Sequence, residues 1–169
     1  TLVSMKGDLL INLNNSVIGK SGLANLTTLR LINMHVQSIQ AEAFRSMKKL
    51  ESLTITTNNI TDLQPGAFIG LGQLYMLDLS RNTLGNLSSG VFEGLRGLRH
   101  LNLRHNPIYY ISAGAFDGIR RKCNCQMNNP PSILDLSHTE IREMEEGSIR
   151  NLCFFTQMKI RLIHGFKAI

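Results

Sequence analysis

Cysteines and histidines are the residues of this sequence that could bind metal or do thiol chemistry. The three cysteines are Cys123 and Cys125, in the string KCNCQ, and Cys153. Zinc sites favour Cys-x-x-Cys spacings and a convergent fourth ligand, so Cys123, Cys125 and His138 fit a zinc site poorly. The sequence also lacks an HExxH motif, a phosphate-binding loop and a G-x-S-x-G motif. We therefore expect no enzyme, no cofactor and no metal site.

Basic residues that could contact charged partners are concentrated in one part of the sequence. From 81 to 122 the chain has seven Lys or Arg residues against two Asp or Glu, which accounts for most of its net charge of +6. A positive surface attracts acidic partners, although the same charge also suits a merely solvated surface. We expect a protein, or an acidic glycan or lipid, as ligand, and no nucleic acid, because aromatic residues do not interleave with the basic ones. The candidate ligand-binding residues are Asp78, Arg81, His100, Asn102, Arg104, His105, Asp135 and His138.

These residues lie within a repeat of 24 residues. The strings LESLTITTN (50–58), LYMLDLSRN (74–82) and LRHLNLRHN (98–106) follow one another at that offset. A fixed period of this length indicates a stacked repeat architecture. At a step of 24, seven columns are apolar in all four units: Leu26, Leu50, Leu74 and Leu98; Leu29, Leu53, Leu77 and Leu101; Leu31, Ile55, Leu79 and Leu103; Val36, Ile60, Leu84 and Ile108; Ile39, Leu63, Leu87 and Ile111; Phe44, Phe68, Phe92 and Phe116; Met47, Leu71, Leu95 and Ile119.

The pattern LxxLxLxxNxIxxL, with unit endings such as AFIGL and VFEGL, resembles the 24-residue class of leucine-rich repeats. That class occurs in extracellular proteins such as Toll-like receptors, Slit-type proteins and small leucine-rich proteoglycans. The resemblance implies an α/β solenoid shaped as a horseshoe, with one short parallel strand per repeat on the concave face. The convex side is expected to be irregular, 3-10 or loop. A module of this kind binds its ligand on the concave face.

The repeat assigns different physical roles to its columns. In the string LNL of 101–103 the leucines point to one face of a strand and Asn102 to the other, because side chains alternate along a strand. The variable positions therefore face the concave surface. Asn58, Asn82 and Asn106 should form a buried ladder that bonds backbone groups at the turn after each strand. We expect the phenylalanine column to stack along the convex side.

The whole of 1–169 is expected to be a single domain, and its regular part, 23–119, holds four repeats. Residues 120–131 form a cysteine-containing insertion, and 132–169 hold two further degenerate repeats, the first at an offset of 33. Residues 1–22 suit an irregular or shortened first repeat. If that unit has 20 residues, Leu9, Ile11 and Asn14 occupy its strand and asparagine columns.

Two features favour an extracellular setting, secreted or on the cell surface. N-x-Ser/Thr sequons occur at Asn14, Asn25, Asn59 and Asn86, which are candidate glycosylation sites. Cys123 and Cys125 are too close for an easy bridge with each other, so Cys153 is expected to pair with one of them. C-terminal caps of extracellular leucine-rich repeat proteins are similar in beginning with Cys-x-Cys. A free thiol remains the alternative.

The two ends of the solenoid lack the usual caps. No cysteine precedes Cys123, and the last strand-like unit leaves Phe155, Met158 and Ile160 without a following repeat. A stack of repeats exposes an apolar cross-section wherever it is not capped. We therefore expect a fragment of something larger, or an oligomer or heteromer formed through these ends. The alternative function is a non-catalytic structural or regulatory subunit, such as an inhibitor or stabilising partner. No segment reads as a transmembrane helix.

Overall fold

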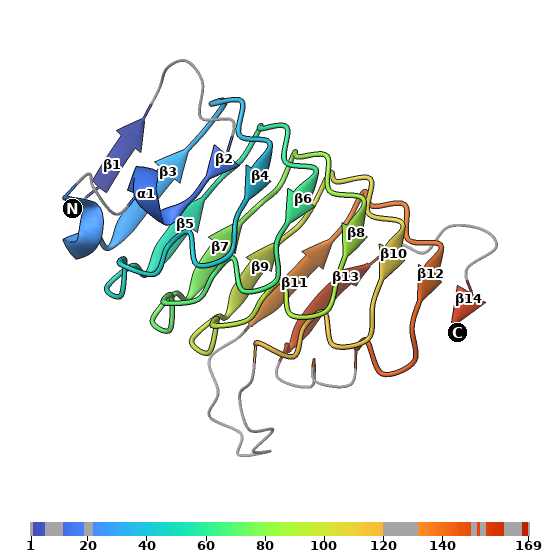
Figure 1. The fold of residues 1–169 in the computed structure, drawn as a ribbon. Coiled ribbons are helices and arrows are strands. Elements are labelled where there is room, and N and C mark those ends of the chain that lie inside the picture. Colours follow the sequence, from blue (N-terminus) through green and yellow to red (C-terminus); the bar gives the residue numbers. More distant parts are fainter. Residues whose placement is uncertain are drawn as a thin grey trace.

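The chain forms a solenoid of parallel strands in a computed structural model (Figure 1). The structure describes residues 2–5, 12–18, 22–119, 132–149, 152, 155–160 and 167–168. Within them, one sheet has the strand order β1-β3-β5-β7-β9-β11-β13, with every pair parallel. Its strands are β1 (Leu2–Met5), β3 (Thr28–Leu31), β5 (Ser52–Thr54), β7 (Met76–Asp78), β9 (His100–Asn102), β11 (Ile133–Leu136) and β13 (Gln157–Ile160).

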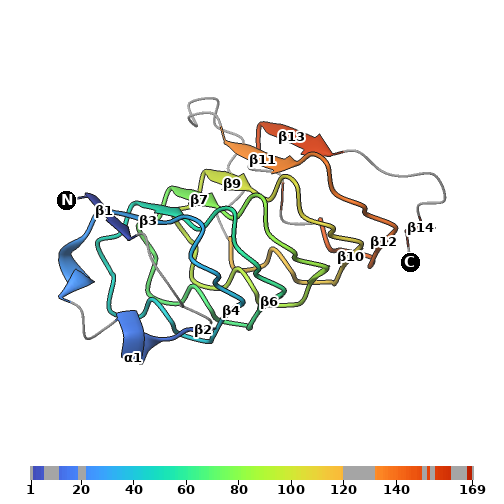
Figure 2. The same ribbon diagram turned by 90° about the horizontal axis from the view of Figure 1, so that it is seen from above.

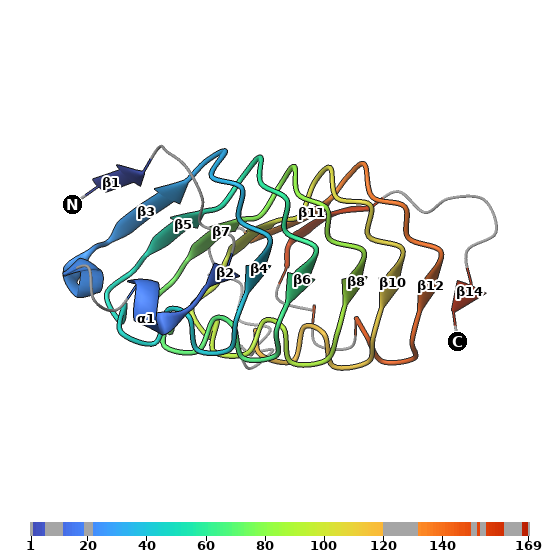
Figure 3. The ribbon, with the colours of Figure 1, turned by 45° about the horizontal axis from the view of Figure 1, so that its top comes forward.

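A second row of short strands runs along the opposite side of the solenoid (Figure 3). A loop or 3-10 convex side was expected, so this row adds parallel pairing that the sequence did not predict. Short 3-10 and α-helical turns, η1 (Leu23–Asn25) and α1 (Asn15–Ile18), occur near the N-terminal end (Figure 2). The convex strands are β2 (Asn12–Leu13), β4 (Ser38–Ile39), β6 (Asp62–Leu63), β8 (Asn86–Leu87), β10 (Tyr110–Ile111), β12 (Glu143–Met144) and β14 (Lys167–Ala168).

The core lies between the two rows of strands and consists of the predicted columns. Every member of the seven apolar columns is buried, with no more than 6% of its surface exposed. The phenylalanine column stacks as predicted. Ring centroids are 6.1 Å apart from Phe44 to Phe68, 6.2 Å from Phe68 to Phe92 and 5.5 Å from Phe92 to Phe116. Each repeat thus buries its apolar residues against its neighbours, as expected for a repeat protein.

The asparagine ladder is confirmed over the three predicted units. Asn82 Nδ2 donates to the carbonyl of Ile55, in the preceding unit, at 2.8 Å and to that of Leu79 at 2.9 Å. Its Oδ1 accepts from the amide N–H of Ile60 at 3.2 Å. Asn58 and Asn106 bond equivalent groups of their own and the preceding unit. The side chain therefore satisfies buried backbone groups on both sides of a repeat boundary.

The register confirms the offset of 33 after the insertion and corrects the first repeat. Ile133 pairs with His100, so β11 continues the column of β9. At the N-terminal end, Val3 pairs with Leu29, an offset of 26 instead of the expected alignment in a 20-residue unit. The assignment of Leu9, Ile11 and Asn14 to strand and ladder columns is therefore wrong. Asn14 instead precedes α1, where its Oδ1 accepts from the amide N–H of Val17 at 3.0 Å.

A clasp on the convex side joins the units that flank the insertion. Glu145, just after β12, accepts hydrogen bonds from the Tyr110 hydroxyl and, at 2.5 Å, from the amide N–H of Ala113. These bonds lower the pKa of Glu145, the one from Tyr110 contributing most. The same bond is the main reason why the pKa of Tyr110 is raised. The clasp adds side-chain bonding to the pairing of β10 with β12.

Replacing Glu145 with glutamine should lower the melting temperature, because a neutral amide is a weaker acceptor for both donors. A carboxylate whose pKa is lowered by folding stabilises the protein above its unfolded pKa, and that stabilisation is lost as the pH falls through the lower, folded pKa. Thermal melts at neutral and acidic pH check this. Glu146→Gln, at the exposed next position, is the control. Equal melting temperatures for the two variants at neutral pH would show that the clasp contributes nothing.

Candidate recognition surface

A shallow hollow of about 260 Å³ lies on the face of the seven-stranded sheet. Strands β7, β9, β11 and β13 each contribute side chains to it, since the variable positions of neighbouring units are brought side by side by the parallel register. Apolar and charged groups are mixed in the lining. The side chains facing the hollow come from Met76, Asp78, His100, Asn102, Ile133, Asp135 and Lys159.

The polar residues in the middle of the strands are partly exposed to solvent and also bond the backbone. Asp78, Asn102 and Asp135 each use Oδ1 to accept the amide N–H two residues on, at 2.9, 3.1 and 2.9 Å respectively. Short acceptors at this spacing satisfy the backbone where a strand turns away. Sequence reasoning assigned these three residues to ligand binding alone.

Asp135, in the hollow, has a carboxyl group whose pKa is lowered by its surroundings. Partial burial acts to raise its pKa, but hydrogen bonds from Ser137 and the nearby charges of Lys159 and Arg104 outweigh this and lower the pKa. Lys159 Nζ lies 3.9 Å from Asp135 Oδ2. Asp135 is therefore ionised at neutral pH, and much of its charge is balanced by a neighbouring cation.

A row of residues in the left-handed backbone conformation borders the strand ends. Each precedes the ladder position of its unit and has a φ between 55° and 58°. The amide N–H groups of Thr57, Arg81 and His105 donate to carbonyls of the next unit, at 3.3, 3.0 and 3.1 Å. The row is thus held by backbone bonds between repeats. Its members are Asn33, Thr57, Arg81, His105 and His138.

In this row the rings of His105 and His138 are stacked, with centroids 4.4 Å apart and planes 16° from parallel. Desolvation is the main cause that lowers the pKa of His105, followed by the charges of His138, Arg104 and Arg81, while Asp135 acts to raise it. Arg81 and Arg104 are exposed. A compact group of two arginines and two histidines therefore lies beside the hollow.

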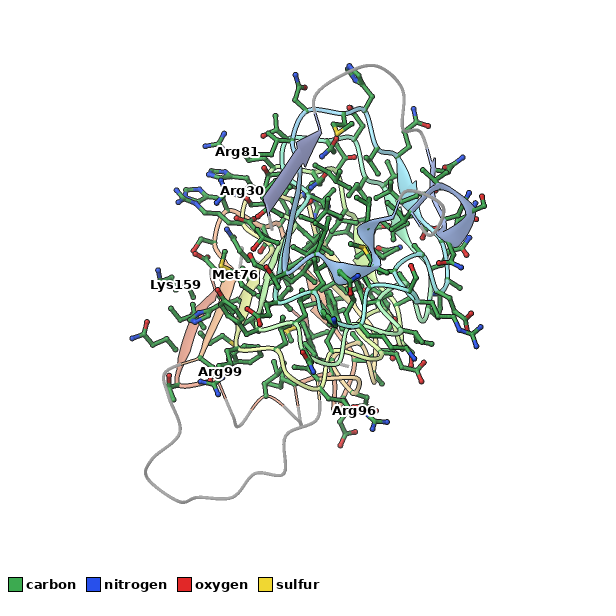
Figure 4. The ribbon with its side chains drawn as sticks, turned by 90° about the vertical axis from the view of Figure 1, so that its left-hand side faces the viewer. Arg30, Met76, Arg81, Arg96, Arg99 and Lys159 are labelled. Carbon is green, nitrogen blue, oxygen red and sulfur yellow. The ribbon has the colours of Figure 1, made fainter. Side chains whose placement is uncertain are left out.

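The predicted ligand-binding residues thus fall into two adjacent sets. Asp78, His100, Asn102 and Asp135 line the hollow. Arg81, Arg104, His105 and His138 form the second set, which we call the cationic edge. Sequence reasoning did not include Met76, Ile133 and Lys159 among the ligand-binding residues. They occupy the same variable columns, which was the signal available to find them. Figure 4 shows Arg30, Met76, Arg81 and Lys159 along one side of the molecule and Arg96 apart from them.

The predicted modification sites lie on different parts of the surface. Asn25, Asn59 and Asn86 are exposed, and Asn14 is partly exposed. Asn86 belongs to β8 on the convex side, while Asn25 Oδ1 accepts a hydrogen bond from Lys49 Nζ at 2.9 Å. Their glycosylation stays a prediction. The expected disulfide of Cys153 with Cys123 or Cys125 lies outside the described residues, as does a cysteine-based zinc site.

No helix in the described part of the chain is long and apolar enough to cross a membrane.

A parallel β-solenoid with an asparagine ladder and a phenylalanine stack defines a class of repeat protein in which each unit packs against its neighbours. The family model of the leucine-rich repeat matches residues 24–84 and 72–121. The chain belongs to the leucine-rich repeat family. No curated protein sequence matches it.

Among solved structures, the chain is similar to the crystal structure of the complex of TLR13 with the single-stranded RNA ssRNA13. The TM-score is 0.61 at 25% sequence identity, and the match covers 92% of this chain. The chain spans about a quarter of that receptor chain, since the match covers 24% of its length. The likeness supports a repeat module of the kind found in Toll-like receptor ectodomains.

Proposed function

We propose that this chain is an extracellular recognition module that binds an acidic macromolecular partner on its concave face, as in an innate-immune receptor or an adhesion protein. The observation that carries the proposal is the adjacency of the hollow and the cationic edge on one rigid sheet face. The hollow contains the apolar side chains of Met76 and Ile133 together with charged ones, and protein interfaces likewise combine apolar and polar groups. The leucine-rich repeat family and the likeness to a receptor ectodomain support it.

The chemistry of the face favours recognition over catalysis. Asp78, Asn102 and Asp135 accept backbone amide N–H groups two residues on. The rings of His105 and His138 stack on each other. Arginine at an exposed edge steers acidic partners and fixes their register. The partner is a protein, or an acidic glycan or lipid.

The second candidate is a non-catalytic structural or regulatory subunit of a larger complex. It is favoured by the exposed apolar residues of the described surface, among them Ile32, Tyr75, Tyr109 and Met158, which are 38–47% exposed. Such residues suit contact with a partner subunit when they gather into a patch. In that case the contact need not involve the concave face.

Reversing charge at the cationic edge should separate these candidates. We expect Arg81→Glu with Arg104→Glu to weaken binding of the physiological partner by roughly tenfold, because both arginines face an acidic ligand. Lys48→Glu with Arg96→Glu makes the same change of charge on another flank, where both residues line a separate hollow. Partner capture from native extracellular fluid, quantified for both variants, measures the effect. Equal losses would place the partner away from the concave face.

A further inference from the structure

The stacked imidazoles of the cationic edge are positioned by the repeat itself. Neighbouring strands of a sheet lie about 4.7–4.9 Å apart, so equivalent side chains of consecutive units stand at nearly that distance. His105 and His138 belong to consecutive units because the offset of 33 restores the register after the insertion. The bond from the His105 amide N–H to the Ser137 carbonyl, 3.1 Å long, fixes the backbone beneath the pair. The rings are therefore held together before any ligand arrives.

Two permanent positive charges adjoin this pair. The charges of Arg81, Arg104 and His138 all lower the pKa of His105, because each disfavours a proton on its ring. Asp135 opposes them, and its charge is shared with Lys159. On the His138 side, Glu140 makes an ion pair of 3.7 Å with Arg142.

Protonation of the pair therefore places up to four positive charges in one small region. Like charges at this separation cost free energy, and a bound anion removes that cost. Proton binding and anion binding at the cationic edge must then favour each other, because linkage between two ligands is reciprocal.

We propose that Arg81, Arg104, His105 and His138 form a binding site for the sulfate groups of an acidic glycan, and that the site binds more tightly as the solution becomes mildly acidic. This inference rests on the proposed function and specifies the acidic partner as a sulfated glycan.

Sulfate esters fit the edge better than the other common anions. A sulfate ester keeps its negative charge throughout the range in which histidine titrates. A phosphate monoester loses part of its charge near pH 6, so its attraction to cations weakens as the solution becomes acidic. Single-stranded nucleic acid is usually held by bases stacked on aromatic side chains. The described strand positions of the concave face carry no Phe, Tyr or Trp, and the two imidazoles already stack on each other.

The test uses the 169-residue chain and a fluorescent heparin-derived oligosaccharide, with anisotropy measured at about pH 5.5 and about pH 7.5. We expect roughly tenfold tighter binding at the lower pH. His105→Asn with His138→Asn should remove most of that difference in affinity between the two pH values. Asparagine suits this backbone, since Asn33 occupies the same column at a φ of 55°. His35→Asn, at another left-handed position with a φ of 56°, is the matched control.

Two further arms identify the source of the anion. A desulfated oligosaccharide of the same length should bind much more weakly, and a single-stranded oligonucleotide should not compete. A third experiment uses NMR on the unmutated chain. The ring resonances of the histidines should change with pH at a higher pH when the sulfated sugar is present than when it is absent. Tighter binding of the oligonucleotide, or the same pH dependence in the double histidine variant, would overturn the proposal. Absence of any binding to the sulfated sugar would overturn it too, while partner capture would still test the proposed function separately.

Discussion

Replacing Gly94 with alanine should lower the free energy of unfolding by about 3 kcal/mol or more. A Cβ at Gly94 would lie 2.8 Å from the Phe68 carbonyl oxygen and 2.9 Å from Ile69 Cα, both in the preceding repeat. Backbone atoms cannot move aside as a flexible side chain does. Gly94 also has a φ of +97°, a conformation that residues with a side chain rarely adopt. The two repeats must therefore separate, or the backbone must strain.

Gly72→Ala is the control for this effect. Gly72 belongs to the same face of the solenoid, but a Cβ there would meet nothing within 4 Å. We expect its free energy of unfolding to change by no more than about 0.5 kcal/mol. Chemical denaturation of both variants gives the comparison. Similar losses at the two positions would show that the repeats do not pack as closely as the structure has them.

Replacing Asn82 with alanine should destabilise the chain by about 1–3 kcal/mol, because buried backbone groups lose their partners. The amide N–H of Ile60 and the carbonyls of Ile55 and Leu79 are among them. Asn82→Thr should recover part of the loss. Thr139 occupies the equivalent position of a later unit, and its Oγ1 donates to the Leu136 carbonyl at 2.8 Å.

Asn86→Ala supplies the comparison in unglycosylated protein. Asn86 is exposed on β8, so its removal should cost about 0.5 kcal/mol or less. Equal shifts in melting temperature for Asn82→Ala and Asn86→Ala would show that the asparagine ladder does not stabilise the fold.

The sequence predicted the parts of the fold in which a column keeps one residue type. Leucine at a period of 24 with strand-like alternation located the concave sheet, and the asparagine and phenylalanine columns located the ladder and the convex stack. The convex strands were missed because two residues are too few to show a period. The first repeat was misaligned because its length of 26 follows neither the regular repeat nor the expected 20 residues.

The candidate site was predicted in composition but not in geometry. Reading the variable columns found Arg81, His105 and His138, but the left-handed backbone of this column was not predicted. Asn and His are enriched in that conformation, whereas Thr57 and Arg81 are not, and the column contains no glycine. His105 stacks on His138 because β9 and β11 are neighbouring strands, although the insertion separates them in sequence. The offset of 33 indicated that the two residues occupy the same column, but the distance between their rings required the structure. The dual role of Asp78, Asn102 and Asp135 depended on hydrogen bonds that only coordinates supply.

Site-specific photo-crosslinking of the captured partner tests the central claim most directly. A photoreactive side chain in place of His100, in the hollow on β9, should form a covalent adduct with the partner. The same group in place of Asp62, exposed on the convex strand β6, should form little or none. Recognition by the concave face predicts that difference. Adducts from position 62 and none from position 100 would contradict it.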